Sequence, residues 1–288
     1  MKASLRALLA ERIDYAGLFP PAALSMTDAV ANFAAYRESA DAWALARFVL
    51  PVVRVEEFEA AAAHHLRGAP WRLSVLAQFT DADAIRAFNA RMAGRARIDT
   101  VESRAATVDD VEALASLASL ATVYVELPIR DDPAPLVAAV AAHGLRAKVR
   151  TGGVVAEPFP LATEVTRFLT TCLRHRVLLK ATAGLHHPLR GEYALTCDAH
   201  SARATMFGFL NVFLAASFAR QGMDTAELAA LLDERNPDAF HVTDDEVTWR
   251  GHRVAAAALA SDRDRFAVSF GSCSFREPLD DLSALSFP

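Results

Sequence analysis

Two kinds of segment alternate along the chain. Short apolar runs recur roughly every thirty residues, and longer Ala- and Leu-rich segments separate them. The runs have few polar positions on either face, which is typical of strands in a parallel sheet that is covered on both sides. They predict eight strands: Ile13–Phe19, Ala46–Pro51, Arg72–Phe79, Ile98–Arg104, Thr122–Leu127, Arg146–Thr151, Val177–Thr182 and Phe266–Phe270.

The longer segments predict helices, and several carry start or stop signals. Ser25 and Thr107 precede two of them as candidate caps, and Gly144 and Gly222 follow two others. The predicted helices are Thr27–Ser39, Val55–Arg67, Asp81–Ala93 with Thr80 as its cap, Val108–Leu120, Pro133–His143, Leu161–Arg176, Ala202–Gln221 and Val254–Ser261.

Strands that alternate with helices indicate parallel βαβ units. Eight such units, without a glycine fingerprint after the first strand, favour a closed (βα)8 TIM barrel over a doubly wound open sheet. The length of 288 residues suits a barrel, and no Pro-, Gly- or Ser-rich linker divides it, so residues 1–288 are expected to form one domain.

Two segments depart from the minimal barrel. Leu185–Ser201 is a long connection after the seventh strand, and long loops at that end of a barrel usually cover or build the active site. Phe240–Val254 predicts a β-hairpin inserted before the last helix, because alternating residues flank the turn-forming Thr243–Asp244–Asp245.

Composition narrows the class of protein. The net charge is −5 and no basic block occurs, which argues against a nucleic-acid partner. No run of eighteen apolar residues predicts a membrane span, and charged residues interrupt the apolar N-terminal stretch, which predicts a short amphipathic helix rather than a signal peptide. Cys172, Cys197 and Cys273 are odd in number and widely spaced, without a CxxC pair. We therefore expect a reducing, cytoplasmic location without a disulfide framework, and a homodimer as the default assembly.

Candidate chemistry lies where polar residues enter the apolar strands. Barrel active sites are built at the carboxyl ends of the strands, and alternation decides which residues share a face. The candidates are Glu102 in the fourth strand, Glu126 at the end of the fifth, Lys148 and Arg150 on one face of the sixth, and Lys180 and Thr182 on one face of the seventh.

A lysine inside an apolar strand is costly to bury unless it is paired or deprotonated. If Lys148, Arg150 and Lys180 crowd one another, one lysine loses its proton more easily and its neutral amine can form a Schiff base with a carbonyl compound. Glu102 or Glu126 would then carry protons. The alternative is that both lysines simply form ion pairs with these glutamates. Spacing leaves both interpretations open.

Three short motifs resemble class I aldolases of the deoxyribose-phosphate aldolase type. They are KVRTGG (148–153), LKATAGL (179–185) and, at the last strand, FGSCSF (270–275), which is similar to that family's phosphate-binding turn. The resemblance covers the second half of the chain. It implies that Lys148 forms the Schiff base, that Lys180 lowers the pKa of that amine, and that Glu102 assists proton transfer.

The chain departs from that family at three points. Glu102 stands where the family has an aspartate, Arg150 stands where a small residue is expected, and His186–His187–Pro188 replaces a glycine-rich turn. An exchange of roles, with Lys180 as the nucleophile, is open. The stretches YAGLFPPA, KATAGLHHP and FGSCSF are also similar to segments of uncharacterised bacterial proteins.

Further candidates lie in the loops that follow the strands. His186 or His187 would serve as an acid, a base or a substrate-binding group, since no metal-ligand spacing surrounds them. Arg190 would bind an anionic group of the substrate. The turn with Gly271, Ser272 and Ser274 would hold a phosphate or carboxylate through backbone N–H groups. Cys273 is a weaker candidate, because the sequence assigns it neither a base nor a helix N-terminus.

These features predict an aldolase-like lyase that forms a Schiff base with a small anionic carbonyl compound. It would need neither a cofactor nor a metal, because the iminium itself is the electron sink. One alternative is a cofactor-independent isomerase or hydrolase, in which the lysines and arginines clamp an anion and Glu126 or a histidine moves protons. The other is a barrel that binds a small anion without catalysis.

Overall fold

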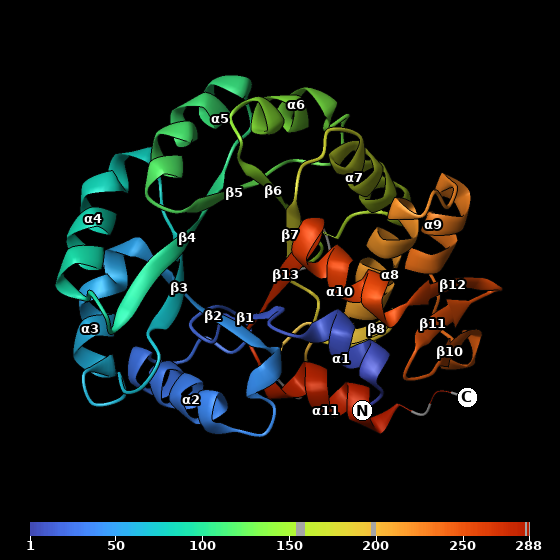
Figure 1. Cartoon of the computed structure of the whole chain (residues 1–288), viewed down its shortest axis with the longest axis horizontal. Coiled ribbons are helices and arrows are strands. Elements are labelled where there is room, and N and C mark those ends of the chain that lie inside the picture. Colours follow the sequence, from blue (N-terminus) through green and yellow to red (C-terminus); the bar gives the residue numbers. More distant parts are fainter. Residues whose placement is uncertain (154–158, 197–199, 286, 288) are drawn as a thin grey trace.

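The computed structural model describes residues 1–153, 159–196, 200–285 and 287. Eight parallel strands close into a barrel in the order β1-β13-β7-β6-β5-β4-β3-β2, and helices surround it (Figure 1). This confirms the predicted TIM-barrel class. The barrel strands are β1 (Ile13–Tyr15), β2 (Leu45–Pro51), β3 (Trp71–Leu76), β4 (Ala96–Arg104), β5 (Thr122–Glu126), β6 (Arg146–Arg150), β7 (Leu179–Thr182) and β13 (Ala267–Ser272).

The helices bury their apolar sides against the barrel strands or, as α1 and α9 do, against neighbouring helices. Ser25 and Thr107 cap their helices as predicted, since each side chain accepts a hydrogen bond from a backbone N–H of the first turn. The helices are α1 (Ala3–Leu9), α2 (Met26–Glu38), α3 (Val55–Ala62), α4 (Ala82–Arg91), α5 (Val108–Leu114), α6 (Ala134–Ala142), α7 (Ala162–Arg174), α8 (Phe209–Arg220), α9 (Thr225–Leu232), α10 (Ala256–Arg265) and α11 (Arg276–Ala284).

Some predicted helix boundaries were wrong. The segment 202–221 does not form one helix, because Arg203–Met206 (β9) pairs with Gly191–Ala194 (β8) as an antiparallel hairpin and α8 begins only at Phe209. Thr80 does not cap α4. Gln78 and Asp81 instead form a capping box around a 3-10 turn that precedes this helix. Two helices, α9 and α11, were not predicted.

The predicted insertion before α10 is present and is larger than a hairpin. Phe240–Val242 (β10) and Glu246–Trp249 (β11) form the expected antiparallel pair, and His252–Ala255 (β12) adds a third strand. This sheet lies outside the barrel near α8 and α9 (Figure 1). No described helix combines the length and apolarity that a membrane crossing requires.

The register of the strands brings the polar residues of the interior together. Lys148 in β6 lies opposite Lys180 in β7, and Glu126 in β5 lies opposite Lys148. Glu102 in β4 is one strand further round the barrel. Because all these strands are parallel, their inward-facing side chains form a layer across the barrel interior.

Candidate active site

A chain of alternating charges crosses the barrel interior. It runs from Asp14 through Lys180 and Glu102 to Lys148 and Glu126, and every adjacent pair is in contact. These five residues come from β1, β7, β4, β6 and β5. All five are buried. Groups of opposite charge in contact inside a barrel offset much of the cost of removing each charge from water.

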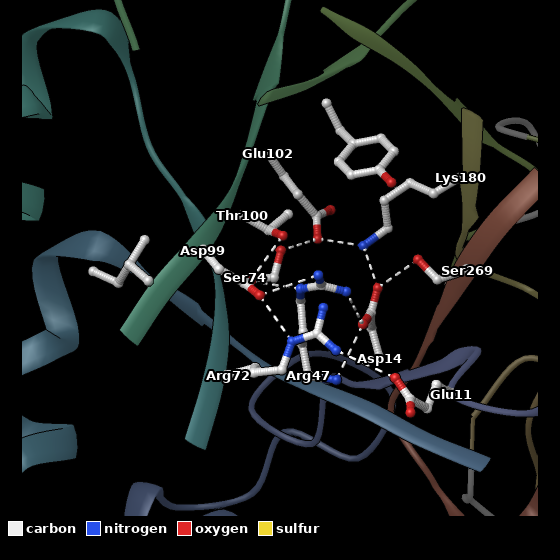
Figure 2. Close-up of polar contacts among 12 residues, drawn as sticks. Glu11, Asp14, Arg47, Arg72, Ser74, Asp99, Thr100, Glu102, Lys180 and Ser269 are labelled. Atoms are coloured by element: carbon white, nitrogen blue, oxygen red, sulfur yellow. Dashed lines mark hydrogen bonds and ion pairs between the residues drawn. The ribbon is translucent and has the colours of Figure 1, made fainter. Parts of the chain in front are cut away.

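Lys180 is the enclosed member of this chain. Its Nζ lies 2.7 Å from Asp14 Oδ2 and 2.6 Å from Glu102 Oε1, and its side chain is 1% exposed. Figure 2 shows the ammonium group between the two carboxylates. Burial alone would lower the pKa of Lys180, but the two carboxylates outweigh burial and raise it well above its ordinary value. Lys180 is therefore a permanent cation. The sequence led us to expect that neighbouring cations crowd both lysines. Lys180 instead lies between two carboxylates, because Asp14 reaches it from β1.

Lys148 has a more open surrounding. Its Nζ lies 2.8 Å from Glu102 Oε2 and 2.9 Å from Glu126 Oε2, so the predicted ion pairs with both glutamates are present. Glu126 is shared, however, because Arg104 and Arg150 also contact its Oε1, at 3.0 and 3.3 Å. Lys148 thus competes with two arginines for one of its two carboxylates.

Both lysines hold Glu102 in its anionic form. Burial by itself would raise the pKa of Glu102, but the charges of Lys148 and Lys180 outweigh burial and hold the pKa far below its ordinary value. Ser74 also donates a hydrogen bond to Glu102, at 2.6 Å. The pKa of Glu126 is lowered too, because Lys148 and the arginines outweigh the effect of burial. At neutral pH both glutamates are proton acceptors rather than donors.

The polar network continues from Asp14 toward the amino ends of the strands. Ser269 donates to Asp14 Oδ2 at 2.8 Å, and the backbone N–H of Arg47 donates to Oδ1 at 3.2 Å. The guanidinium of Arg47 binds Asp99, which also binds Arg72 (Figure 2). Lys180 therefore lies at the inner end of a polar network that extends toward the amino ends of the barrel strands.

A pocket of about 290 Å³ opens above Lys148 at the carboxyl ends of the strands. Five of the candidate site residues line it: Lys148, Glu102, Arg150, Thr182 and Gly271. Lys180 is not among the described residues of its wall. Apolar side chains from the loop after β1, from the long connection after β7 and from β9 also line it: Phe19, Pro20, Pro21, Leu195 and Met206. The segment Leu185–Ser201 thus contributes to the pocket.

Two glycines allow the loops after β6 and β7 to meet beside the pocket. A Cβ on Gly152 would lie 2.9 Å from the Cα of Gly184, which leaves no room for a side chain. Gly184 also has a φ of +74°, and Ala183 before it has a φ of +62°. A residue with a side chain in this left-handed conformation is strained, and such strain tends to occur at functional sites. Thr151 Oγ1 holds the turn by donating to Ala183 O at 2.6 Å.

A second polar cluster lies in the wall of the same pocket. His186 Nδ1 is 3.8 Å from the sulfur of Cys273 and 3.2 Å from Glu277 Oε2. Both His186 and Cys273 line the pocket. The sequence indicated His186 but did not pair it with Cys273, and it missed Glu277, which belongs to the unpredicted helix α11.

Other predicted residues lie outside the pocket. His187 pairs with Asp281 at 2.5 Å and stacks on the ring of Tyr193. Arg190 pairs with Asp233 at 2.9 Å and lies over the ring of Phe207.

The two serines of the predicted anion turn are also placed differently from Gly271. Ser272 is buried at the end of β13 and, among the described residues, has no hydrogen-bond partner for its hydroxyl. Ser274 accepts a hydrogen bond from the N–H of Glu277 in the first turn of α11. Neither is among the residues that line the pocket.

Sequence reasoning missed Asp14, although a signal for the lysine site was available. Asp14 is a single acid in a three-residue strand, and its partner Lys180 is far away in the chain. The stronger signal is composition: of the 30 lysines and arginines, the lysines are Lys2, Lys148 and Lys180 alone. A chain that otherwise uses arginine keeps lysine at two interior positions, where a compact ammonium group or a reactive amine is required.

A larger hollow of about 1040 Å³ lies at the opposite end of the barrel. It is lined by the first residues of several strands, including Arg72, Arg97 and Arg146, and by neither interior lysine. Because barrel active sites lie at the carboxyl ends, the smaller pocket above Lys148 is the candidate site despite its size. Among the residues that the structure describes, no group of three or more His, Cys, Asp and Glu side chains is arranged to hold a metal ion.

Comparisons with known proteins add little to this geometry. No family model matches the chain, and no curated protein matches it. One similar solved structure is the crystal structure of a lysine/ornithine decarboxylase complexed with cadaverine from Vibrio vulnificus, with 11% sequence identity and a TM-score of 0.37. The match covers 62% of this chain and spans about half of the other, 48%. We draw no conclusion about the reaction from it.

Proposed function

We propose that this barrel is an enzyme that forms a Schiff base between Lys148 and a small anionic carbonyl compound, in a lyase reaction of the class I aldolase type. The observation that carries the proposal is the position of Lys148. Its amine lines the pocket and is also connected, through Glu102, to a second lysine that is sealed beneath it.

The proposed reaction requires the ammonium group of Lys148 to lose a proton. Glu126, at 2.9 Å, and Glu102, at 2.8 Å, are the acceptors within reach. Glu126 is the better candidate, because Glu102 is also held as an anion by the enclosed Lys180. Glu126 is not among the described residues that line the pocket, so it would act on Lys148 through their direct contact. The neutral amine then attacks the carbonyl carbon, and the proton returns to the carbinolamine hydroxyl, which leaves as water.

Lys180 has a different part in this proposal. Held by Asp14 and Glu102, it keeps its charge throughout and fixes the position of Glu102. When the iminium forms on Lys148, Glu102 lies next to it and stabilises its positive charge. Lys180 is thus a positioning residue, because it acts through Glu102 rather than on the substrate.

An anionic substrate suits the cations at the rim of the pocket. Arg150 lines the pocket, its side chain is 37% exposed, and its contacts with Glu126 and with the carbonyl oxygen of Gly152 are both 3.3 Å long, so it can exchange them for a carboxylate or phosphate. Thr182 and Gly271 are next to it in the wall. We place the reacting carbonyl at Lys148 and the anionic group at Arg150.

Reductive trapping tests the proposal. The protein is incubated with pyruvate, glyoxylate, acetaldehyde or acetone, reduced with sodium borohydride and examined by intact mass and peptide mapping. We expect an irreversible adduct on Lys148. Lys148→Arg, which keeps the charge but cannot form an imine, should remove it. No adduct on Lys148 with any of the four carbonyl compounds would contradict the proposal.

A matched comparison tests the anion site separately. Arg150→Gln should reduce the yield of the pyruvate adduct by about tenfold and leave the acetone adduct nearly unchanged, because only pyruvate carries a carboxylate for Arg150 to bind. Equal losses with both compounds would instead indicate that Arg150 acts through Glu126.

A second candidate function is acid–base catalysis with the lysines as fixed charges. Its support is that both interior lysines are ion-paired and that His186 lines the pocket. Such an isomerase or hydrolase would be insensitive to borohydride, and His186 and Glu126 would be the residues that transfer protons.

A further inference from the structure

Cys273 has surroundings that differ from those of a structural cysteine. It follows β13, lies in the pocket wall and has the ring of His186 3.8 Å from its sulfur. Cys172 provides the comparison within the same chain. Its thiol is fully buried in α7, and burial raises its pKa far above the ordinary value. Small molecules that enter the pocket therefore meet the thiol of Cys273 and not that of Cys172.

His186 is held so that it can carry a proton next to this thiol. Burial alone would lower the pKa of His186, but its hydrogen bonds with Cys273 and Glu277 outweigh burial and raise the pKa to about 10. The contact with His186 in turn lowers the pKa of Glu277. At neutral pH the ring is an imidazolium and Glu277 is a carboxylate, so Nδ1–H faces both the carboxylate and the sulfur.

The cluster is separate from the lysine network. Cys273, His186 and Glu277 come from the ends of β13 and β7 and from α11, and none of them contacts Lys148, Glu102 or Glu126 in the structure's hydrogen bonds and ion pairs among described residues. The pocket is nevertheless common to both, with Lys148 and Cys273 in its wall. One small ligand can therefore meet an amine and a thiol.

We propose that Cys273 is a second nucleophile of the pocket, which captures a small aldehyde as a reversible thiohemiacetal, with His186 as its acid–base partner and Glu277 as the residue that positions the ring. The proposal does not depend on Schiff-base chemistry at Lys148.

The step needs no oxidant, reductant or co-reactant. The thiol of Cys273 releases its proton to solvent, its sulfur forms a bond to the aldehyde carbon, and the π electrons of the carbonyl move to its oxygen. That oxygen takes the proton from the imidazolium of His186, which leaves a neutral ring and a neutral thiohemiacetal. The reverse step returns the proton to His186 and releases the aldehyde.

Labelling with iodoacetamide tests the pair first. Initial rates at Cys273 are measured at neutral pH by peptide mapping on the full-length protein, with Cys172 as the internal control that stays unlabelled in the folded chain. We expect His186→Gln to slow labelling of Cys273 by about tenfold. Glu277→Gln, at a half-buried position of α11, should slow it less. Equal rates in the wild type and in Glu277→Gln and His186→Gln would overturn the proposal.

Protection by an aldehyde tests the thiohemiacetal. The probe is acetaldehyde without borohydride, and the protein is the Lys148→Arg variant, in which no iminium can form at residue 148. Acetaldehyde should slow the labelling of Cys273 reversibly, and acetone, a poor acceptor for thiols, should not. Labelling that is unaffected by acetaldehyde would overturn the proposal. Because the variant lacks the amine, this result is independent of whether the wild type is trapped by borohydride.

Discussion

The two interior lysines lie opposite each other on neighbouring strands and share one carboxylate, yet their surroundings differ. Lys180 has Asp14 and Glu102, and the latter's Oε1 also accepts from Ser74. Lys148 has Glu102 and Glu126, but Glu126 is divided among three cations, and one side of Lys148 faces the pocket. One lysine is enclosed by the polar network and the other lies at its edge.

This difference indicates that the two lysines have different roles, which their shared residue type does not reveal. A cation enclosed by carboxylates stabilises the fold and fixes the position of its partners, and its proton is held firmly. A cation at the edge of the same network can exchange its partners for a ligand. The barrel thus uses Lys180 as support and presents Lys148 to the pocket.

The largest expected effect is on stability at Lys180. Lys180→Met leaves Asp14 and Glu102 buried without their shared cation, and we expect the free energy of unfolding to fall by about 3–5 kcal/mol. Chemical denaturation measures it, with Lys2→Met as the control, since Lys2 is exposed. A loss below about 1 kcal/mol would mean that the two carboxylates find other partners, and the contrast between the lysines would fail.

A smaller loss is expected at Lys148. In Lys148→Met, Glu102 keeps Lys180 and Glu126 keeps its arginines, and water can enter from the pocket. We expect the free energy of unfolding to fall by about 2–3 kcal/mol. The same denaturation experiment compares the two variants directly. A loss equal to that of Lys180→Met would show that Lys148 contributes as much to the stability of the fold as Lys180.

The hydrogen bond from Ser74 sharpens the comparison. Ser74→Ala removes a donor to the buried carboxylate of Glu102, and we expect a loss of about 1.5 kcal/mol. Ser103→Ala is the matched control, because Ser103 donates at 3.3 Å to the neutral amide of Gln78. Thermal and chemical denaturation should place the loss of Ser103→Ala clearly below that of Ser74→Ala. Equal losses would contradict the importance assigned to Glu102.

The smallest expected effect is a difference in pH dependence. The pKa of Glu102 is depressed in the folded chain, so its stabilisation is fully present above its unfolded value of about 4.3 and is lost as the pH falls through the folded pKa. The wild type should therefore keep its stability between pH 7 and pH 5 and lose it at lower pH.

In Lys180→Met the sign reverses, because the burial of Glu102 is no longer balanced by that cation and its folded pKa rises above the unfolded value. Lowering the pH from 7 to 5 should then raise the free energy of unfolding by about 1 kcal/mol. Denaturation at both pH values measures the sign. A flat profile in the variant, like that of the wild type, would contradict the role of Lys180 as the balancing charge.

The sequence was sufficient to predict the barrel and to single out the two lysines in its interior. Buried parallel strands are uniform apolar runs, so their positions were predictable, and a lysine such as Lys180 is conspicuous within one. The hairpin of β8 and β9 was not predictable in the same way, because its exposed strands alternate weakly and the Ala-rich segment that follows resembles a longer helix.

The rest of the site depends on contacts between distant parts of the chain. Asp14 reaches Lys180 only because the barrel closes between β1 and β13, next to β7. Cys273 lies beside His186 because β13 pairs with β7, and Glu277 reaches the ring of His186 from α11. Closure and the packing of a short helix leave no periodic signal in the sequence.

The most direct test of the contrast between the two lysines is site-resolved trapping in the wild-type chain. Pyruvate and borohydride are added at neutral pH, and the modified fraction is measured at Lys2, Lys148 and Lys180 in one peptide map. We predict that Lys148, although its side chain is only 7% exposed, is modified faster than the exposed Lys2, and that Lys180 stays unmodified. Modification of Lys180, or of Lys2 ahead of Lys148, would contradict the account.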